Sequence, residues 1–414
     1  MRKNFTWGTD FISEGTKDTT VSGSAVFVGF TDAELDTAAK AKLTGRIVFA
    51  FIGKKSFAND TSASATMRRL FAFRRDAGAA ATLMIPDTEG SATFQKALHM
   101  MSSFGSDKGT MRMKDSIPQP QQQYIRFLVS PDLAETVLKP SGKSLKQIKA
   151  EALSDQQFAP VFIDNVSITI VSKAIHEIKQ TENVLGFLPG SDPDLKSQVV
   201  LYTAHYDHLG KSPKGTIYPG ADDDGSGTVT ILELAKAFVS NPIKPKRSLL
   251  FMTVVGEEKG LFGSKYYTNN PIFPLDKTMA DINLDMIGRI DTIYEAIKDT
   301  NYMYVIGSDK ISLELDSLLI VANNETEHFK LDYRYNDEHD PQRFYYRSDH
   351  YNFAKNSVPI VFFFDGIHRD YHKPTDTVDK ILFDRIAKIG RLVYDLGWHL
   401  ANLSLPLTKI PKQQ

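Results

Sequence analysis

Five short clusters of histidine and carboxylate residues occur in the C-terminal part of the chain. They lie at His205–His208, Asp222–Asp224, Glu257–Glu258, Asp285 and Asp370–Asp376. Imidazole and carboxylate groups are ligands that zinc takes in proteins. Each cluster alone has an ordinary explanation, such as a solvated strand end, a capped acidic turn or a structural salt bridge. Together, within one domain, they predict two metal ions that share a bridging carboxylate.

The first two clusters supply a histidine and a local excess of negative charge. His205 and Asp207 are two residues apart, so in an extended backbone their side chains share one side of a strand. The triplet Asp222–Asp224 precedes a predicted helix start. Three adjacent carboxylates repel one another unless cations are near, and a helix N-terminus offsets only part of that charge. The flanking glycines let the backbone approach a metal ion closely.

The other three clusters supply ligands and candidates for proton transfer. Glu257 and Glu258 follow an apolar strand, so one can hold a metal while the other takes a proton from water. Asp285 lies between apolar neighbours, where a buried charge needs a partner. In the last cluster, His372 is a candidate ligand and Tyr371 a candidate donor to a developing oxyanion.

The elements that position these clusters are apolar strands that alternate with helices. Strands are expected at 199–203, 249–255, 282–284 and 358–364, and helices at 228–239 and 381–403. This pattern predicts an α/β domain with a mixed central β-sheet flanked by helices. Ligands of such sheets bind beyond the carboxyl ends of the strands, where the clusters are placed. Short strands before residue 160 predict a smaller β-rich domain at 1–163, followed by the α/β domain at 164–414.

Composition excludes several classes of partner and site. The chain has 49 basic and 50 acidic residues, a net charge of -1 that gives no reason to expect nucleic acid or an anionic membrane. It has no cysteine, which excludes disulfides, thiolate metal sites and a cysteine nucleophile. The first residues lack the apolar stretch of a secretion signal. We therefore expect either a cytoplasmic protein or one whose signal lies outside this numbering.

The five clusters resemble those of peptidase family M28, zinc peptidases that include bacterial aminopeptidases. The likeness covers roughly residues 165–405, with the motifs in the family's order. It implies the zinc-exopeptidase (phosphorylase/hydrolase-like) fold and two Zn²⁺ ions. It further implies peptide substrates and the release of their N-terminal amino acids.

The resemblance also implies a role for each site residue. The implied metal ligands are His205, Asp223, Glu258, Asp285 and His372, with Asp223 bridging the two ions. Glu257 would be the general base toward the attacking water, Asp207 would orient His205, and Tyr371 would stabilise the oxyanion. Asp224 would support the ligands, and a cis peptide bond is expected between Asp223 and Asp224.

The N-terminal part bears a weaker likeness to a protease-associated (PA) domain. Leu43–Val48 and Arg75–Ala81 carry it. Members of the family are commonly exported, so we expect a periplasmic or secreted protein, with a cytoplasmic one as the alternative. The oligomeric state and the side-chain preference are left open.

Three other functions fit parts of the sequence. A glutaminyl-peptide cyclotransferase shares the fold but works with one zinc, and the PA-like domain and the continuation His208-Leu209-Gly210 argue against it. A non-catalytic binding protein would have lost ligands, whereas all five positions are filled here. A carboxypeptidase or dipeptidase is not separated from an aminopeptidase by these residues.

Overall fold

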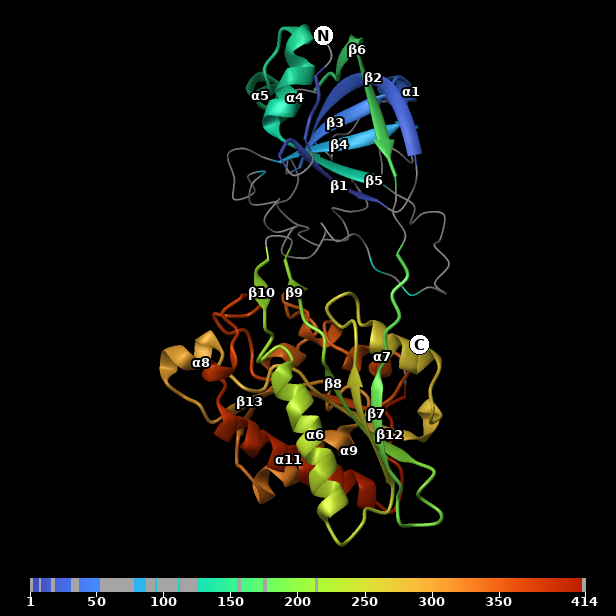
Figure 1. The fold of residues 1–414 in the computed structure, drawn as a ribbon, viewed down its shortest axis with the longest axis vertical. Helices are drawn as coiled ribbons and strands as arrows, with labels where there is room; N and C mark the ends of the chain where they lie inside the picture. Colours follow the sequence, from blue (N-terminus) through green and yellow to red (C-terminus); the bar gives the residue numbers. More distant parts are fainter. Residues whose placement is uncertain are drawn as a thin grey trace. The chain divides into compact units, whose positions relative to one another are not determined.

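The computed structural model divides the chain into two compact units, Met1–Ile178 and Lys179–Gln414. It describes residues 3–6, 9–15, 19–30, 37–52, 78–86, 94, 111, 113, 125–154, 158–173, 177–212 and 215–411. Figure 1 labels most of the helices and strands of both units. The second unit contains all five clusters of candidate site residues.

The first unit is built on a six-stranded mixed sheet with the strand order β1-β5-β4-β3-β2-β6. Its elements are β1 (Phe11–Gly15), β2 (Thr19–Phe30), α1 (Thr37–Ala41), β3 (Ile47–Ile52), β4 (Ala81–Pro86), β5 (Ile125–Val129), α4 (Pro131–Leu138), α5 (Leu145–Leu153) and β6 (Val161–Ser172). Strands β2, β3, β4 and β5 are parallel, and β1 and β6 run antiparallel to their neighbours. This confirms the predicted smaller β-rich unit, although helices α4 and α5 were not predicted.

Strand β6 corrects the predicted domain boundary. The expected division at residues 163 and 164 falls inside β6, which pairs with β2 along most of its length. Strand pairing therefore keeps this segment in the first unit, and the division lies after Ile178. The identity of this unit as a PA-like domain stays a prediction, and residues 75–77 of its second motif lie outside the described residues.

The second unit is a seven-stranded mixed sheet with the order β14-β13-β15-β12-β8-β11-β7. Its strands are β7 (Val184–Leu188), β8 (Val199–His205), β11 (Ser248–Val254), β12 (Thr278–Leu284), β13 (Tyr302–Ile306), β14 (Lys330–Asp332) and β15 (Ile360–Phe364). Strands β9 (Gly210–Lys211) and β10 (Ile217–Tyr218) form a separate hairpin. The four central strands β15, β12, β8 and β11 are parallel, so their carboxyl ends meet at one edge. The predicted mixed sheet is confirmed.

Helices cover both faces of this sheet. They are α6 (Gly225–Ser240), α7 (Phe262–Asn269), α8 (Thr292–Ile297), α9 (Leu313–Glu325), α10 (His350–Ala354) and α11 (Phe383–Asn402). Helices α6, α9 and α11 pack on one face, where α6 and α11 lie side by side (Figure 1). Helices α7 and α10 pack on the other face. Because helices cover both faces, the central strands are buried on both sides and carry apolar residues on both faces.

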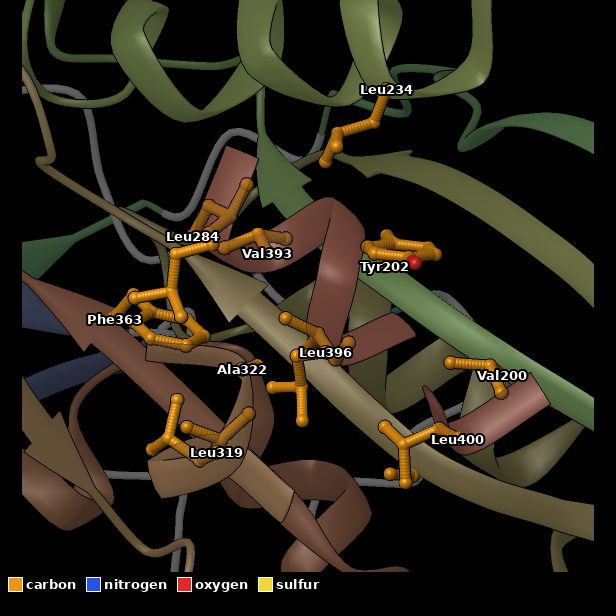
Figure 2. Packing of buried hydrophobic residues seen from close by; sticks show 14 of the residues in the cluster. Val200, Tyr202, Leu234, Leu284, Leu319, Ala322, Phe363, Val393, Leu396 and Leu400 are labelled. Carbon is orange, nitrogen blue, oxygen red and sulfur yellow. The ribbon is translucent and has the colours of Figure 1, made fainter. Parts of the chain in front are cut away.

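Alternate residues of one strand enter the two cores. Val200 and Tyr202 of β8 point toward α6 and α11, and Val199 and Leu201 point toward α7 and α10. Figure 2 shows Tyr202 among Leu234, Val393 and Leu396 in the first core. This two-sided packing fixes β8, so the residue at its carboxyl end, His205, has a defined position.

Candidate metal centre

The first group of donor atoms lies at the carboxyl ends of two neighbouring parallel strands. His205 is the last residue of β8, and Asp285 directly follows β12. The Nε2 atom of His205 lies 3.6 Å from Oδ1 of Asp285 and 3.2 Å from Oδ1 of Asp223. All three residues are buried. Their ligand atoms lie within 4.8 Å of one another, close enough to hold one cation.

The tautomer of His205 leaves Nε2 free to bind a metal. Its Nδ1 atom lies 2.9 Å from the backbone carbonyl oxygen of Asp207. A carbonyl oxygen only accepts, so Nδ1 carries a proton and Nε2 is the nitrogen that can bind a metal in place of a proton. The carboxylate of Asp207 is farther from Nδ1, at 3.8 Å. Asp207 therefore orients His205 through its main chain.

Asp223 lies between two groups of donors. Its Oδ1 faces His205, whereas its Oδ2 lies 3.1 Å from Nε2 of His372. The peptide bond between Asp223 and Asp224 is cis, as the resemblance predicts. The carboxylate of Asp376 accepts hydrogen bonds from the backbone amides of Asp222 and Asp223. These bonds tie the acidic turn to the loop that carries His372.

The second group of donors contains Glu258 and two histidines. Oε1 of Glu258 lies 3.4 Å from Nε2 of His372 and 2.8 Å from Nδ1 of His208. His208 also lies 3.7 Å from Oδ2 of Asp223. The sequence interpretation placed Glu258 and His372 here but gave His208 no role. Its position three residues after His205, just beyond the end of the same strand, was the available signal.

Several donor atoms of both groups are buried and make no hydrogen bond among the described residues. Among the described residues, Nε2 of His205, Nδ1 of His208 and Oε1 of Glu258 are buried without a hydrogen-bond partner. Such atoms carry a desolvation cost unless a ligand meets them. Nitrogen and carboxylate oxygen donors suit zinc, so the residues fit the metal that the resemblance implies.

The carboxylates dominate the electrostatics of the site. Burial alone would lower the pKa of His205, but Asp285 and Asp223 outweigh it and raise that pKa well above its usual value. Burial also lowers the pKa of His372. The carboxylates of Asp223 and Glu258 outweigh burial and raise this pKa to about 9. The same carboxylates that hold protons on these imidazoles would favour metal cations in their place.

Glu257 lies beside the first group of donors. Its Oε2 is 4.0 Å from Nε2 of His205, and its backbone amide donates to Oδ1 of Asp207. The same oxygen of Asp207 accepts the amide of Gly256, which fixes the turn after β11. Burial, reinforced by the charge of Asp285, raises the pKa of Glu257 well above its usual value. A carboxylate with a raised pKa is a stronger base, as a general base requires.

Further residues make hydrogen bonds to the candidate ligands or to the backbone that carries them. Asp224 accepts hydrogen bonds from the amides of His205, Gly227 and Met286, and so joins β8, α6 and the end of β12. The hydroxyl of Ser348 donates to Oδ2 of Asp285 at 2.6 Å. The sequence resemblance implied support by Asp224. It did not identify the contact between Ser348 and Asp285.

A pocket opens beside these donors. Its lining includes Glu257, Tyr371 and Arg347, and an apolar wall made of Met286, Phe344, Phe362, Phe364 and Ile367. Nη2 of Arg347 donates to the hydroxyl of Tyr371 at 3.2 Å. Tyr371 also stacks on His372, with ring centroids 3.9 Å apart. The structure thus brings the eight predicted site residues into one region, with Glu257 and Tyr371 both facing the pocket.

Comparison with protein-family models shows to which family the chain is related. A model of peptidase family M28 matches residues 183–397, more than half of the chain. The chain belongs to peptidase family M28. The match includes all the donors described above, and it confirms the family suggested by the sequence motifs.

Relatives of this M28 chain include aminopeptidases. It is 27% identical over 256 residues to a probable leucine aminopeptidase of Trichophyton verrucosum, a stretch that covers 60% of this chain and 65% of that one. Aminopeptidase YwaD of Bacillus subtilis is 27% identical over 267 residues, covering 60% and 49% of the two chains. The aligned stretches thus span about half to two thirds of the length of these relatives.

Solved structures share the fold of the M28 chain. An aminopeptidase from Aneurinibacillus sp. strain AM-1 has a TM-score of 0.55 at 20% identity, with 98% of this chain and 82% of that one covered. A zinc aminopeptidase from Bacillus subtilis has a TM-score of 0.52 at 19% identity, with 95% and 79% covered. In the part of the chain that the structure describes, no helix combines the length and apolar character needed to cross a bilayer.

Proposed function

We propose that this M28 chain is an aminopeptidase that depends on two Zn²⁺ ions and releases N-terminal amino acids from peptides. The observation that carries the proposal is the position of Asp223. Its two carboxylate oxygens face two separate histidines, His205 and His372, at 3.2 and 3.1 Å. A carboxylate between two groups of nitrogen and oxygen donors is the arrangement that two metals with a shared ligand require.

The ligands are assigned from these distances. His205, Asp285 and Asp223 would hold one zinc, and Asp223, Glu258 and His372 would hold the other. Zinc ions bound there would polarise a peptide carbonyl and lower the pKa of water. The buried, unpartnered atoms of His205 and Glu258 support this assignment.

Glu257 acts as the general base. Its carboxylate lines the pocket beside the first group of donors and carries a raised pKa. It takes a proton from the attacking water and later returns it to the leaving amine. The hydroxyl of Tyr371, held by Arg347, donates to the carbonyl oxygen as negative charge develops there.

The charge of the site favours a free N-terminus. Glu257 lines the pocket and is not an assigned zinc ligand, so its carboxylate is available to attract the ammonium group of a substrate. The apolar wall of the same pocket suits a large apolar side chain. Arg347 supports the carboxypeptidase or dipeptidase alternative, because its guanidinium faces the same pocket and would pair with a free carboxylate.

The proposal is tested by metal content together with hydrolysis of amino-acid p-nitroanilides. We expect two zincs per chain, release of p-nitroaniline, loss of activity with a chelator and recovery when zinc is restored. A single zinc with cyclisation of N-terminal glutamine would indicate the cyclotransferase instead. A folded protein that takes up no zinc and cleaves nothing would indicate a binding protein.

Blocked substrates separate the exopeptidase alternatives. An aminopeptidase loses activity when the substrate N-terminus is acetylated and keeps it when the C-terminus is amidated. A carboxypeptidase gives the reverse pattern. A dipeptidase tolerates neither modification.

A further inference from the structure

His208 is a buried imidazole to which the proposed mechanism gives no role. It lies in the turn after β8, and its side chain is only 7% exposed. Among the described residues, neither of its ring nitrogens has a hydrogen-bond partner. An imidazole with two unpartnered buried nitrogens is unusual, because burial without partners costs free energy.

The inner nitrogen of this ring faces the second group of donors. Nδ1 of His208 lies 2.8 Å from Oε1 of Glu258, yet both atoms lack the alignment of a hydrogen bond. The ligand atoms of His208, Glu258 and Asp223 also lie within 4.8 Å of one another, close enough to meet one cation. Donors at zinc distances of about 2.0–2.2 Å lie roughly 3.3–3.6 Å from one another in a tetrahedral site. The separations of His208 from Glu258 and Asp223, 2.8 and 3.7 Å, lie on either side of this range.

The backbone makes room for this ring. Gly220 has a φ of 64°, and a Cβ atom built on it would lie 2.5 Å from Cγ and 2.7 Å from Cβ of His208. Any larger residue at position 220 would displace the imidazole. The rings of His208 and His372 meet edge to face with centroids 5.7 Å apart. Both histidines therefore flank the same pair of carboxylates.

We propose that His208 is a further protein ligand of the metal that Asp223, Glu258 and His372 hold. The inference rests on the proposed function, since it requires that the site bind metal. It gives this metal four protein donors, whereas the metal at His205 and Asp285 has three. Metal sites closed by four protein ligands are typical of structural ions, and three ligands leave a position open for substrate. The site with His208 should then fill first and release its metal last.

The test uses cobalt(II) in the unaltered protein first. Each coordinated imidazole keeps one exchangeable ring N–H proton, which the paramagnetic ion shifts far outside the normal proton NMR range. Three such signals are expected for the protein with two cobalt ions, from His205, His372 and His208. Two signals would overturn the inference while leaving the two-metal site intact. Protein that binds no cobalt or zinc would refute the proposed function itself.

A substitution gives an independent answer, because the chain has no cysteine of its own. Nδ1 is the ring nitrogen nearer the main chain, so a short thiolate at position 208 comes close to the same point. H208C loaded with cobalt should show a near-ultraviolet thiolate-to-cobalt charge-transfer band. Y206C is the control, since Tyr206 is exposed and its hydroxyl bonds to the backbone of Glu182 outside the site. A band in neither variant would contradict the inference.

Metal affinity separates a ligand from a hydrogen-bonding neighbour. H208A should weaken one of the two zinc sites more than about 100-fold and leave the other within about tenfold. Loss of a residue that only supports a ligand typically weakens binding by about 10- to 100-fold. In that case, H208N would restore binding by donating to Glu258, and such rescue would overturn the inference. Circular dichroism of each variant shows that it is folded before titration.

Discussion

At the scale of single residues, the proposed role of Glu257 allows catalysis to be tested separately from metal binding. Its side chain lines the pocket but lies outside both groups of ligands. E257Q keeps the shape and removes the ability to take a proton. We expect kcat to fall by about 10²–10⁴, the usual contribution of a general base, with two zincs retained. Metal analysis and steady-state kinetics measure both quantities. Activity within about tenfold of the wild type, or loss of zinc, would contradict the assignment.

His350 predicts how stability depends on pH. Burial lowers the pKa of His350 to about 3, and its Nε2 lies 2.9 Å from the carbonyl oxygen of Tyr345. In the unfolded chain the imidazole gains a proton below about pH 6.5. The unfolded state therefore binds more protons between these values, and the free energy of unfolding falls as pH falls. Titration of His350 should lower the free energy of unfolding by about 2 kcal/mol when the pH falls from about 7 to about 5.

Urea unfolding at these two pH values measures this effect. H350Q removes the titrating group, so the difference between the two unfolding free energies should shrink by about 2 kcal/mol. H339Q is the matched control, because His339 is exposed with 94% of its side chain accessible. Equal pH dependence in the wild type and in H350Q would show that His350 does not titrate as expected.

At the scale of elements, two glycines of α11 allow the packing of this helix against its neighbours to be tested. A Cβ atom at Gly397 would overlap the hydroxyl oxygen of Tyr202 and lie 2.7 Å from its Cζ, whereas one at Gly390 would lie 3.8 Å from Thr230. G397A should therefore destabilise by about 1–3 kcal/mol through overpacking. G390A should stabilise by roughly 0.5–1 kcal/mol, because alanine is the better helix former.

Chemical unfolding of the two variants compares the same substitution in one helix. Opposite signs would confirm that α11 packs closely against β8 at Gly397 and loosely against α6 at Gly390. A stabilising effect of G397A would mean that Tyr202 moves aside without cost. Since Tyr202 and His205 belong to the same strand, G397A should also weaken zinc binding.

At the scale of the whole molecule, the site belongs to one unit. Every proposed ligand lies within residues 179–414, and this unit has its own cores on both faces of its sheet. We expect a fragment of residues 179–414 to fold, bind two zincs and cleave small p-nitroanilides. Gel filtration, metal analysis and kinetics of the fragment measure this. A fragment that aggregates or binds no zinc would show that the first unit contributes to the fold of the second.

The domain boundary shows what a local pattern cannot supply. Residues 166–171 of β6 form a strand because their apolar and β-branched residues favour extended backbone. The predicted boundary assigned these residues to the wrong unit, because a strand belongs to the sheet that contains the strand with which it pairs. That partner is β2, about 140 residues earlier in the chain, where Val21 lies opposite Ile170.

The sequence by itself indicated five of the candidate donor residues, though not His208, and the edge of the sheet where they gather. His205 and Asp285 follow apolar runs, and parallel strands place such residues at one edge whatever their order. Only the tertiary structure decided which side chains meet there. Ser348 reaches Asp285 across 63 residues, and Asp376 reaches the amide of Asp223 across 153. The physical reason is that strand ends are set by local composition, whereas contacts between distant loops depend on how the whole sheet and its helices pack.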